Sequence, residues 1–241
     1  MKSRIINSLI WRIRNSSNNA LIYLSEDKLV CVTNYDFIKK IFILYENFIK
    51  IKTHNIILPG EKNEFCLEAI YAAVLADKTF INLNLNQTKK RLEEIIEQFS
   101  DYKYFSTSDI QAVIKESQLN QKDFFIEDII PILNKLKFKK QIQNNFAYIM
   151  FTSGSTGKPK GVIISNKSLK IFMEYVHKIL VENMNLFLKE QLSLSPFYFD
   201  NFIFDLVFFN ENRGCIYLID IKILINQEKL DKIIGLKYLL K

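Results

Sequence analysis

Ten residues in the second half of the chain bring together the groups that can hold an anion. Residues 152–161 read Thr-Ser-Gly-Ser-Thr-Gly-Lys-Pro-Lys-Gly, and they contain three of the six glycines of the chain. Glycines allow backbone N–H groups to approach a ligand, while hydroxyl and lysine side chains add further donors and positive charge. The segment therefore predicts an anion-binding loop rather than a polar hairpin turn that binds nothing.

The order of the residues separates this loop from two other phosphate-binding patterns. The Walker pattern needs four residues between its glycines and then Gly-Lys-Ser/Thr, and the dinucleotide fingerprint is Gly-x-Gly-x-x-Gly. Neither pattern fits residues 152–161. The donors predicted from residue type are the hydroxyls of Thr152, Ser153, Ser155 and Thr156, the backbone around Gly154 and Gly157, and the charges of Lys158 and Lys160.

The elements around the loop predict an α/β fold. Apolar strand patterns occur at residues 54–58, 79–83, 102–106, 146–151, 162–165, 191–195 and 215–219, and a hairpin pattern covers residues 20–33. Helical patterns occur at residues 1–20, 34–51, 61–77, 87–99, 108–117, 166–188, 201–210 and 227–240. Strands that alternate with helices at this spacing favour sheets with crossover helices. We interpret residues 118–145 as a connecting segment, and we expect Asn166 or Ser168 to cap the helix after the loop.

Composition excludes several classes of protein. The chain has 241 residues, of which 49% are hydrophobic and 24% charged, so collagen-like and broadly disordered chains are excluded. The net charge of +7 is interpreted as solvated lysine, because no motif with interleaved aromatic residues indicates nucleic-acid binding. The three cysteines and two histidines show no zinc-ligand spacing. The N-terminus shows no signal-peptide pattern and no long uncharged run predicts membrane insertion, so we expect a cytoplasmic protein.

The residues around the loop resemble a known family. The stretch AYIMFTSGSTGKPKGV is similar to the phosphate-loop signature of the adenylate-forming superfamily, which includes amino-acid adenylation domains, acyl-CoA synthetases and luciferases. Residues 32–37 resemble the family's early TYxEL segment, and residues 72–84 resemble its LKAGxAYVPID segment with the glycine replaced. Residues 195–200 are similar to the FDxS segment of members that activate amino acids. The resemblance covers nearly the whole chain.

Asp200 separates the branches of that family. In amino-acid-activating members, the aspartate of this segment pairs with the α-ammonium group of the substrate, whereas fatty-acid and aryl-acid activators generally lack it. A carboxylate in a partly apolar pocket is unfavourable without a cationic partner, so Asp200 fits a substrate with an amine. Asp200 can also cap a helix that starts near Asn201, and the two roles are compatible. Phe202 replaces the family's serine, and residues 196–206 look most like D-alanine–carrier protein ligases.

The resemblance implies a reaction and its partners. A carboxylate and Mg-ATP give an acyl-adenylate and pyrophosphate, and the acyl group then passes to a phosphopantetheine thiol on a carrier protein. In that scheme the loop, including Gly161, holds the β- and γ-phosphates, with ATP and Mg²⁺ as the cofactors. The residues implied to line the amino-acid site are Tyr198, Phe199, Asp200, Asn201 and Phe204. The alternatives are acyl-CoA synthetase-type activation and a non-catalytic nucleotide-binding remnant, which would bind ATP without pyrophosphate exchange.

The chain is short for that family. Members run to roughly double this length, and we find no match to the adenine-binding segment, the ribose-binding aspartate, the hinge or the C-terminal lysine. We therefore assign no catalytic residue and expect the N-terminal part of the large domain, from a truncated or split enzyme. Residues 1–145 would form a first subdomain, and residues 146–241 would begin a second one that carries the phosphate loop.

Overall fold

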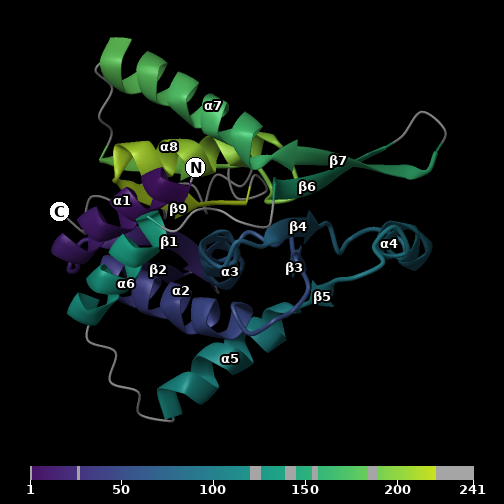
Figure 1. The fold of residues 1–241 in the computed structure, drawn as a ribbon, viewed down its shortest axis with the longest axis horizontal. Coiled ribbons are helices and arrows are strands. Elements are labelled where there is room, and N and C mark those ends of the chain that lie inside the picture. Colours follow the sequence, from purple (N-terminus) through teal and green to yellow (C-terminus); the bar gives the residue numbers. More distant parts are fainter. Residues whose placement is uncertain are drawn as a thin grey trace.

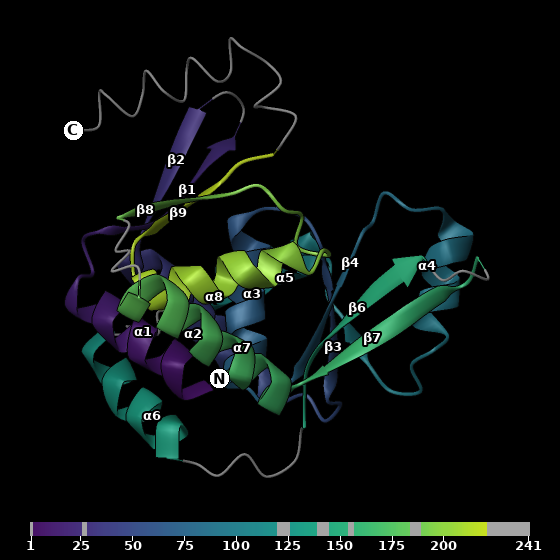
Figure 2. The ribbon, with the colours of Figure 1, turned by 90° about the horizontal axis from the view of Figure 1, so that it is seen from above.

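The computed structural model describes residues 2–25, 28–119, 126–138, 145–153, 157–183 and 189–220. Within these ranges the chain forms two sheets with helices packed around them (Figures 1 and 2), which confirms the α/β class. The expected closing helix at residues 227–240 lies outside the described residues. None of the helices in the described ranges combines the length and the apolar character needed to cross a membrane.

The larger sheet has the strand order β5-β3-β4-β6-β7. Its parallel strands are β3 (Asn55–Pro59), β4 (Thr79–Leu83), β5 (Lys103–Tyr104) and β6 (Phe146–Ser153). The crossover helices are α3 (Glu64–Leu75) between β3 and β4, and α4 (Lys89–Ile96) between β4 and β5. β7 (Pro159–Ser165) closes the edge as the antiparallel partner of β6. The sheet therefore brings the β6–β7 hairpin next to the carboxyl ends of β3 and β4.

The smaller sheet joins the two ends of the described chain. Its order is β2-β1-β9-β8, where β1 (Asn19–Ser25) and β2 (Lys28–Thr33) form the expected hairpin. β9 (Cys215–Leu218) lies parallel to β1 on one side and to β8 (Glu190–Ser193) on the other.

The remaining helices cover both sheets. They are α1 (Lys2–Arg14), α2 (Asn34–Phe48), α5 (Thr107–Leu119), α6 (Ile126–Phe138), α7 (Asn166–His177) with the π-helical segment η1 (Lys178–Asn183), and α8 (Asn201–Asn212). Polar side chains cap several helix starts by accepting a hydrogen bond from a backbone N–H of the first turn. Those caps are Thr33, Asn63, Thr88 and Ser165.

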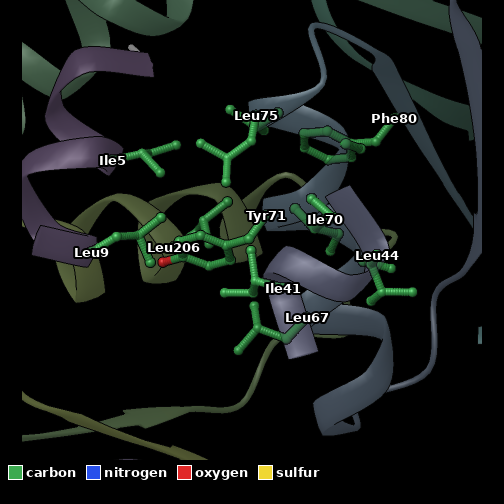
Figure 3. Close-up of a cluster of buried hydrophobic side chains, with 14 of the residues drawn as sticks. Ile5, Leu9, Ile41, Leu44, Leu67, Ile70, Tyr71, Leu75, Phe80 and Leu206 are labelled. Carbon is green, nitrogen blue, oxygen red and sulfur yellow. The ribbon is translucent and has the colours of Figure 1, made fainter. Parts of the chain in front are cut away.

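Most of the core lies where α1, α2, α3 and α8 meet beside β4. Figure 3 shows Leu9, Ile41, Tyr71 and Leu206 converging from these four helices, and Phe80 of β4 lies close by. Each of these side chains is buried. The alanines of α3 allow neighbouring elements to approach this helix closely, and the helix is buried on nearly all sides.

A fully buried arginine stabilises the end of α8. The Arg12 guanidinium donates hydrogen bonds to the backbone carbonyls of Phe209 (3.2 Å) and Gly214 (3.1 Å) and to Asn34 Oδ1 (3.0 Å). It also lies 3.8 Å from the centre of the Phe209 ring. Burial lowers the pKa of Arg12 to about 10, so the group keeps its charge at neutral pH.

The structure corrects three expectations. Within the segment interpreted as a connection, residues 126–138 form α6, because Ile129, Leu133 and Leu136 recur at helical spacing and are buried despite Pro131. The cap of α7 is Ser165, not Asn166 or Ser168, since strand β7 runs directly into the helix. α7 is also shorter than residues 166–188, because the i→i+4 hydrogen-bond pattern gives way to π-helix after His177.

Candidate functional site

The predicted phosphate-binding segment lies at the tip of the β6–β7 hairpin. Strand pairing continues to Ser153 opposite Pro159, so the turn is shorter than the loop expected at residues 152–161. The longer estimate was wrong because Thr152, Lys160 and Gly161 satisfy the strand register even though their residue types suggest a loop. Thr152 and Lys160 face each other as neighbours on the two strands, and both are exposed.

The structure describes only some of the residues at the tip of the hairpin. Gly154, Ser155 and Thr156 lie outside the described residues. Gly157 has φ +80°, a backbone conformation that favours glycine, and Lys158 beside it is exposed. Gly161 lies on β7 against an aromatic ring, because a Cβ atom there would be 3.2 Å from Cζ of Phe151.

A cavity of about 480 Å³ opens at the base of the same hairpin. It lies between the hairpin, the start of α7 and the start of α8, and its size is within the range of small-molecule sites. Its lining is mainly apolar with a few polar groups: Tyr148, Ile164, Ser168, Leu169, Phe172, Asp200, Asn201, Ile203 and Phe204. Three predicted substrate-site residues (Asp200, Asn201 and Phe204) therefore lie together.

Asp200 keeps a carboxylate at this cavity without a cationic partner. Its Oδ1 atom accepts a hydrogen bond from the backbone N–H of Asn201 at 2.9 Å, so Asp200 does cap α8. The side chain is exposed, and no lysine, arginine or histidine in the described part of the chain forms an ion pair with it. Burial, and then the charge of Asp200, raises the pKa of the neighbouring Tyr148 to about 12, so that phenol stays protonated.

Tyr198 and Phe199 contact each other rather than the cavity. Their ring centres lie 5.2 Å apart, Phe199 is exposed, and neither residue is part of the described lining of the cavity. Tyr198 packs against Gly60, where a Cβ atom would lie 2.6 Å from Cδ1 of the ring. A Cβ atom there would also lie 2.8 Å from the carbonyl oxygen of Leu83, so this close approach requires glycine.

Two residues that sequence reasoning missed hold the segment before Asp200. Asn82 Nδ2 on β4 donates a buried 2.9 Å hydrogen bond to the carbonyl of Phe197. Lys62 Nζ, in the segment after β3, donates to the carbonyls of Ser193 (3.2 Å) and Ile219 (2.9 Å), at the ends of β8 and β9. Burial lowers the pKa of Lys62 to about 8, and the charges of Asp205 and Asp220 oppose this shift. For Asn82, the sequence signal was a polar residue in an apolar stretch. For Lys62, there was no signal in the sequence.

Two further contacts reach the tip of the hairpin from α4 and the turn after it. Arg91 Nη1 donates to the carbonyl of Gly157 (3.4 Å), and Gln98 Nε2 donates to the carbonyl of Pro159 (3.1 Å). Sequence reasoning treated this segment only as a charged amphipathic helix. Its link to the hairpin requires the tertiary fold, because more than fifty residues separate the two segments.

Comparison with protein families decides the identity of this fold. A family model described as AMP-binding enzyme matches residues 52–233, which include the larger sheet, the hairpin and the cavity. The chain belongs to the AMP-binding enzyme family. Membership confirms the resemblance to the adenylate-forming superfamily that was read from the hairpin segment.

Curated relatives of this AMP-binding chain include D-alanine--D-alanyl carrier protein ligases. The protein of Staphylococcus aureus (strain JH9) is 30% identical over 175 residues, which are 72% of this chain and 34% of the relative. The protein of Staphylococcus epidermidis is 30% identical over 145 residues, which are 60% of this chain and 28% of the relative. The chain therefore spans about a third of the length of these relatives.

Solved structures confirm the fold of the large domain of adenylate-forming enzymes. The adenylation domain AlmE of Vibrio cholerae, in complex with glycyl-adenosine-5'-phosphate, aligns with a TM-score of 0.66 at 19% identity, over 94% of this chain and 47% of that one. A fatty acyl-adenylate ligase from L. pneumophila aligns with a TM-score of 0.67 at 14% identity, over 94% of this chain and 41% of that one. Because amino-acid and fatty-acid activators both share the fold, substrate choice must be argued from the site.

Proposed function

We propose that this AMP-binding chain takes part in the ATP-dependent activation of an amino acid as an aminoacyl-adenylate. The observation that carries this proposal is Asp200, an exposed carboxylate that lines a mainly apolar cavity of about 480 Å³ and forms no ion pair within the described ranges. A negative charge there favours a substrate with an ammonium group over a fatty or aryl acid, which would add a second negative charge. The S. aureus and S. epidermidis relatives named as D-alanine--D-alanyl carrier protein ligases support the same branch.

In this proposal, one hairpin carries both halves of the site. The tip around Gly157 and Lys158 binds ATP phosphates through backbone N–H groups and positive charge. The base, with Tyr148 opposite Ile164, forms part of the amino-acid cavity. A strand rise of about 3.3 Å per residue places Tyr148 about 17 Å along β6 from Ser153. ATP and the amino acid would thus occupy successive parts of the hairpin.

Mg²⁺ would enter this site together with ATP. The described ranges hold no group of three or more His, Cys, Asp or Glu side chains arranged for a metal ion. Mg²⁺ is commonly held by substrate phosphates, water and one or two protein groups, and it neutralises phosphate charge when bound. The hydroxyl-rich tip, with Thr152 as its described hydroxyl, fits a metal that arrives on the phosphates and needs no preformed cage.

The proposal extends to the acceptor of the acyl group. An aminoacyl-adenylate is a reactive mixed anhydride, and a phosphopantetheine thiol on a carrier protein would accept its acyl group. The names of the curated relatives include a carrier protein, which supports this partner class. Since the chain spans about a third of those relatives, we propose that it contributes the phosphate loop and part of the acyl cavity to the complete reaction.

Equilibrium binding and ATP–pyrophosphate exchange with a panel of amino, fatty and aryl acids test this function. We expect the chain to bind ATP and an amino acid, and Asp200→Asn to weaken amino-acid binding at least tenfold while leaving ATP binding unchanged. Asp128→Asn, on the exposed face of α6, is the matched control. Binding of fatty or aryl acids in place of amino acids would favour acyl-CoA synthetase-type activation. If the chain bound ATP but none of the acids, the result would favour the non-catalytic nucleotide-binding remnant.

A further inference from the structure

Arg91 in α4 and Gln98 in the turn after it hold the same arm of the hairpin tip. Arg91 donates a hydrogen bond to the carbonyl of Gly157, and Gln98 donates one to the carbonyl of Pro159. The two acceptors are two residues apart on the hairpin, and the two donors are seven residues apart on α4 and the turn after it. Gln98 Nε2 also donates to the carbonyl of Glu94 (2.9 Å), which fixes its side chain against α4. The arm of the tip is thereby connected to a helix rather than left to solvent.

α4 is itself anchored to the strands on which the hairpin is built. Ile95, between the two bonding residues, is 1% exposed. It belongs to a small apolar cluster under the larger sheet, whose other buried members are Ile57, Ile81, Leu83 and Ile149. Figures 1 and 2 both show α4 beside the far end of the hairpin. The helix is therefore a fixed support relative to β3, β4 and β6.

An aromatic contact fastens the hairpin to the same support. The Phe99 ring, just past α4, lies edge-on to the Phe151 ring at 6.0 Å between centres. Phe151 also contacts Gly161, where a Cβ atom would lie 3.2 Å from Cζ of the ring. Phe151 directly precedes Thr152, so this contact fixes the point at which β6 enters the phosphate-binding segment. The entry to the tip and its exit arm are thus held by one element.

The start of α4 carries positive charge close to the hairpin tip. Lys89, Lys90 and Arg91 occupy its first turn, at the positive end of the helix dipole. Such placement is unfavourable for the helix alone, and only Lys89 has an ion pair with a carboxylate in the described chain, with Glu93 at 3.7 Å. This charge attracts an anion at the neighbouring tip over a distance that salt screens, without contacting it.

We propose that α4 is a positioning element for the phosphate-binding tip, acting through Arg91 and Gln98. The inference rests on the proposed function. In a trans peptide the C=O and the following N–H point in opposite directions. When Arg91 holds the carbonyl of Gly157, the N–H of Lys158 therefore faces away from α4, where it can donate to a phosphate. Arg91 and Gln98 are thus positioning residues: they fix the peptides that bind the anion.

Six variants and three measurements test this role. Arg91→Ala and Gln98→Ala, singly and together, remove the two contacts, while Lys115→Ala and Gln111→Ala remove a basic residue and a glutamine from the exposed face of α5 as controls. ATP affinity is measured by calorimetry, amide exchange of residues 150–162 without ligand by mass spectrometry, and stability by thermal unfolding. Arg91→Lys is added because it keeps the charge but changes the geometry.

The expected result is weaker ATP binding while the chain stays folded in thermal unfolding. Each test variant should raise the ATP Kd about fivefold, the value of one hydrogen bond, and should speed exchange across residues 150–162. In the double variant, the fold-increase in the ATP Kd should be smaller than the product of the two single increases, because both contacts act on one arm. Arg91→Lys should recover part of the affinity, and both controls should match the native chain.

The two proposals fail in different measurements. Unchanged exchange in Arg91→Ala and Gln98→Ala would overturn the positioning role of α4, whether or not ATP binds. Equal ATP affinity in native chain and variants would overturn it as well. A native chain that binds no ATP would instead overturn the proposed function, while the exchange result would still report whether α4 holds the tip.

Discussion

The side-chain amide of Asn82 donates a 2.9 Å hydrogen bond to the backbone carbonyl of Phe197, and both residues are buried. This bond joins the middle strand of the larger sheet to the segment that leads into Asp200. Gly60 supports the same segment from the next strand, through its contact with Tyr198. The position of the carboxylate at the cavity is therefore set by two residues that do not line the cavity.

Asn82→Ala should destabilise the fold and weaken amino-acid binding. It leaves the buried carbonyl of Phe197 without this partner, which costs about 1–3 kcal/mol of unfolding free energy. The loop would then be free to move Asp200, so amino-acid affinity should fall while ATP affinity is retained. Urea denaturation and calorimetry measure both effects. Asn86→Ala is the control, since the Asn86 side chain is exposed, and equal stability of the two variants would contradict the prediction.

Gly60→Ala and Gly157→Ala should fail in different ways. At Gly60 the new methyl group meets the backbone oxygen of Leu83, which cannot move away, so overpacking should cost about 1–3 kcal/mol of stability. At Gly157 nothing lies within 4 Å of the new methyl group, and the strain comes from φ +80°. That variant should cost about 1 kcal/mol and weaken ATP binding specifically. Thermal unfolding and ATP titration of both variants distinguish the two causes.

Arg213→Gly should stabilise the chain. Arg213 follows α8 with φ +57°, in the left-handed region that disfavours side chains, and its charge opposes that of the buried Arg12. Replacement by glycine removes the backbone cost of about 1 kcal/mol as well as the repulsion. Arg213→Ala removes only the repulsion, so it should gain less. A lower denaturation midpoint for the glycine variant than for the alanine variant would show that the conformation is not strained.

Glu68→Gln should flatten the dependence of stability on pH. Burial raises the pKa of Glu68 well above its usual 4.5, and the nearby charge of Lys40 opposes the shift while Glu64 and Asp36 add to it. A raised pKa in the fold contributes stability below pH 4.5, and this contribution is lost as the pH rises through the folded pKa. The native chain should therefore lose stability from pH 4.5 toward neutrality, and the glutamine variant should lose less.

The control for that measurement is the neighbouring carboxylate. Glu64 accepts hydrogen bonds from Lys40 Nζ (2.9 Å) and the Tyr23 hydroxyl (3.0 Å), so Glu64→Gln breaks a paired charge and should lower stability at neutral pH. Denaturant midpoints at a series of pH values from 4 to 8 would separate the two variants. Identical pH profiles of stability for the native chain and Glu68→Gln would refute the raised pKa of Glu68.

The sequence predicted most elements of the fold but little of what links them. Strands such as residues 79–83 were found because apolar, β-branched residues end at clear turn signals. α6 was missed because Pro131 and flanking lysines obscured its buried stripe, which its contacts with α1 and α2 reveal. The motif around Asp77 indicated that a glycine had been replaced. The structure shows why this position favours glycine, because the φ of Asp77 is +56°.

The candidate site was predictable where chemistry is local and unpredictable where it depends on tertiary contacts. The tip of the hairpin and Asp200 were visible as residue types in a recognisable order. The contributions of Asn82, Lys62 and α4 depend on distances between segments far apart in the chain, which no local pattern encodes. For the same reason Tyr198, two residues before Asp200 in sequence, packs against Gly60 and not into the cavity.

The parallel pairing of β1 with β9 has a consequence for the synthesis of this protein. Leu21 pairs with Ile216, so the smaller sheet joins segments that lie far apart in the chain and leave the ribosome at different times. Until β9 emerges, the β1–β2 hairpin keeps an open strand edge that can pair with other chains. A nascent chain stalled before Cys215 should therefore aggregate or recruit chaperones, whereas one released after Leu218 can close the sheet.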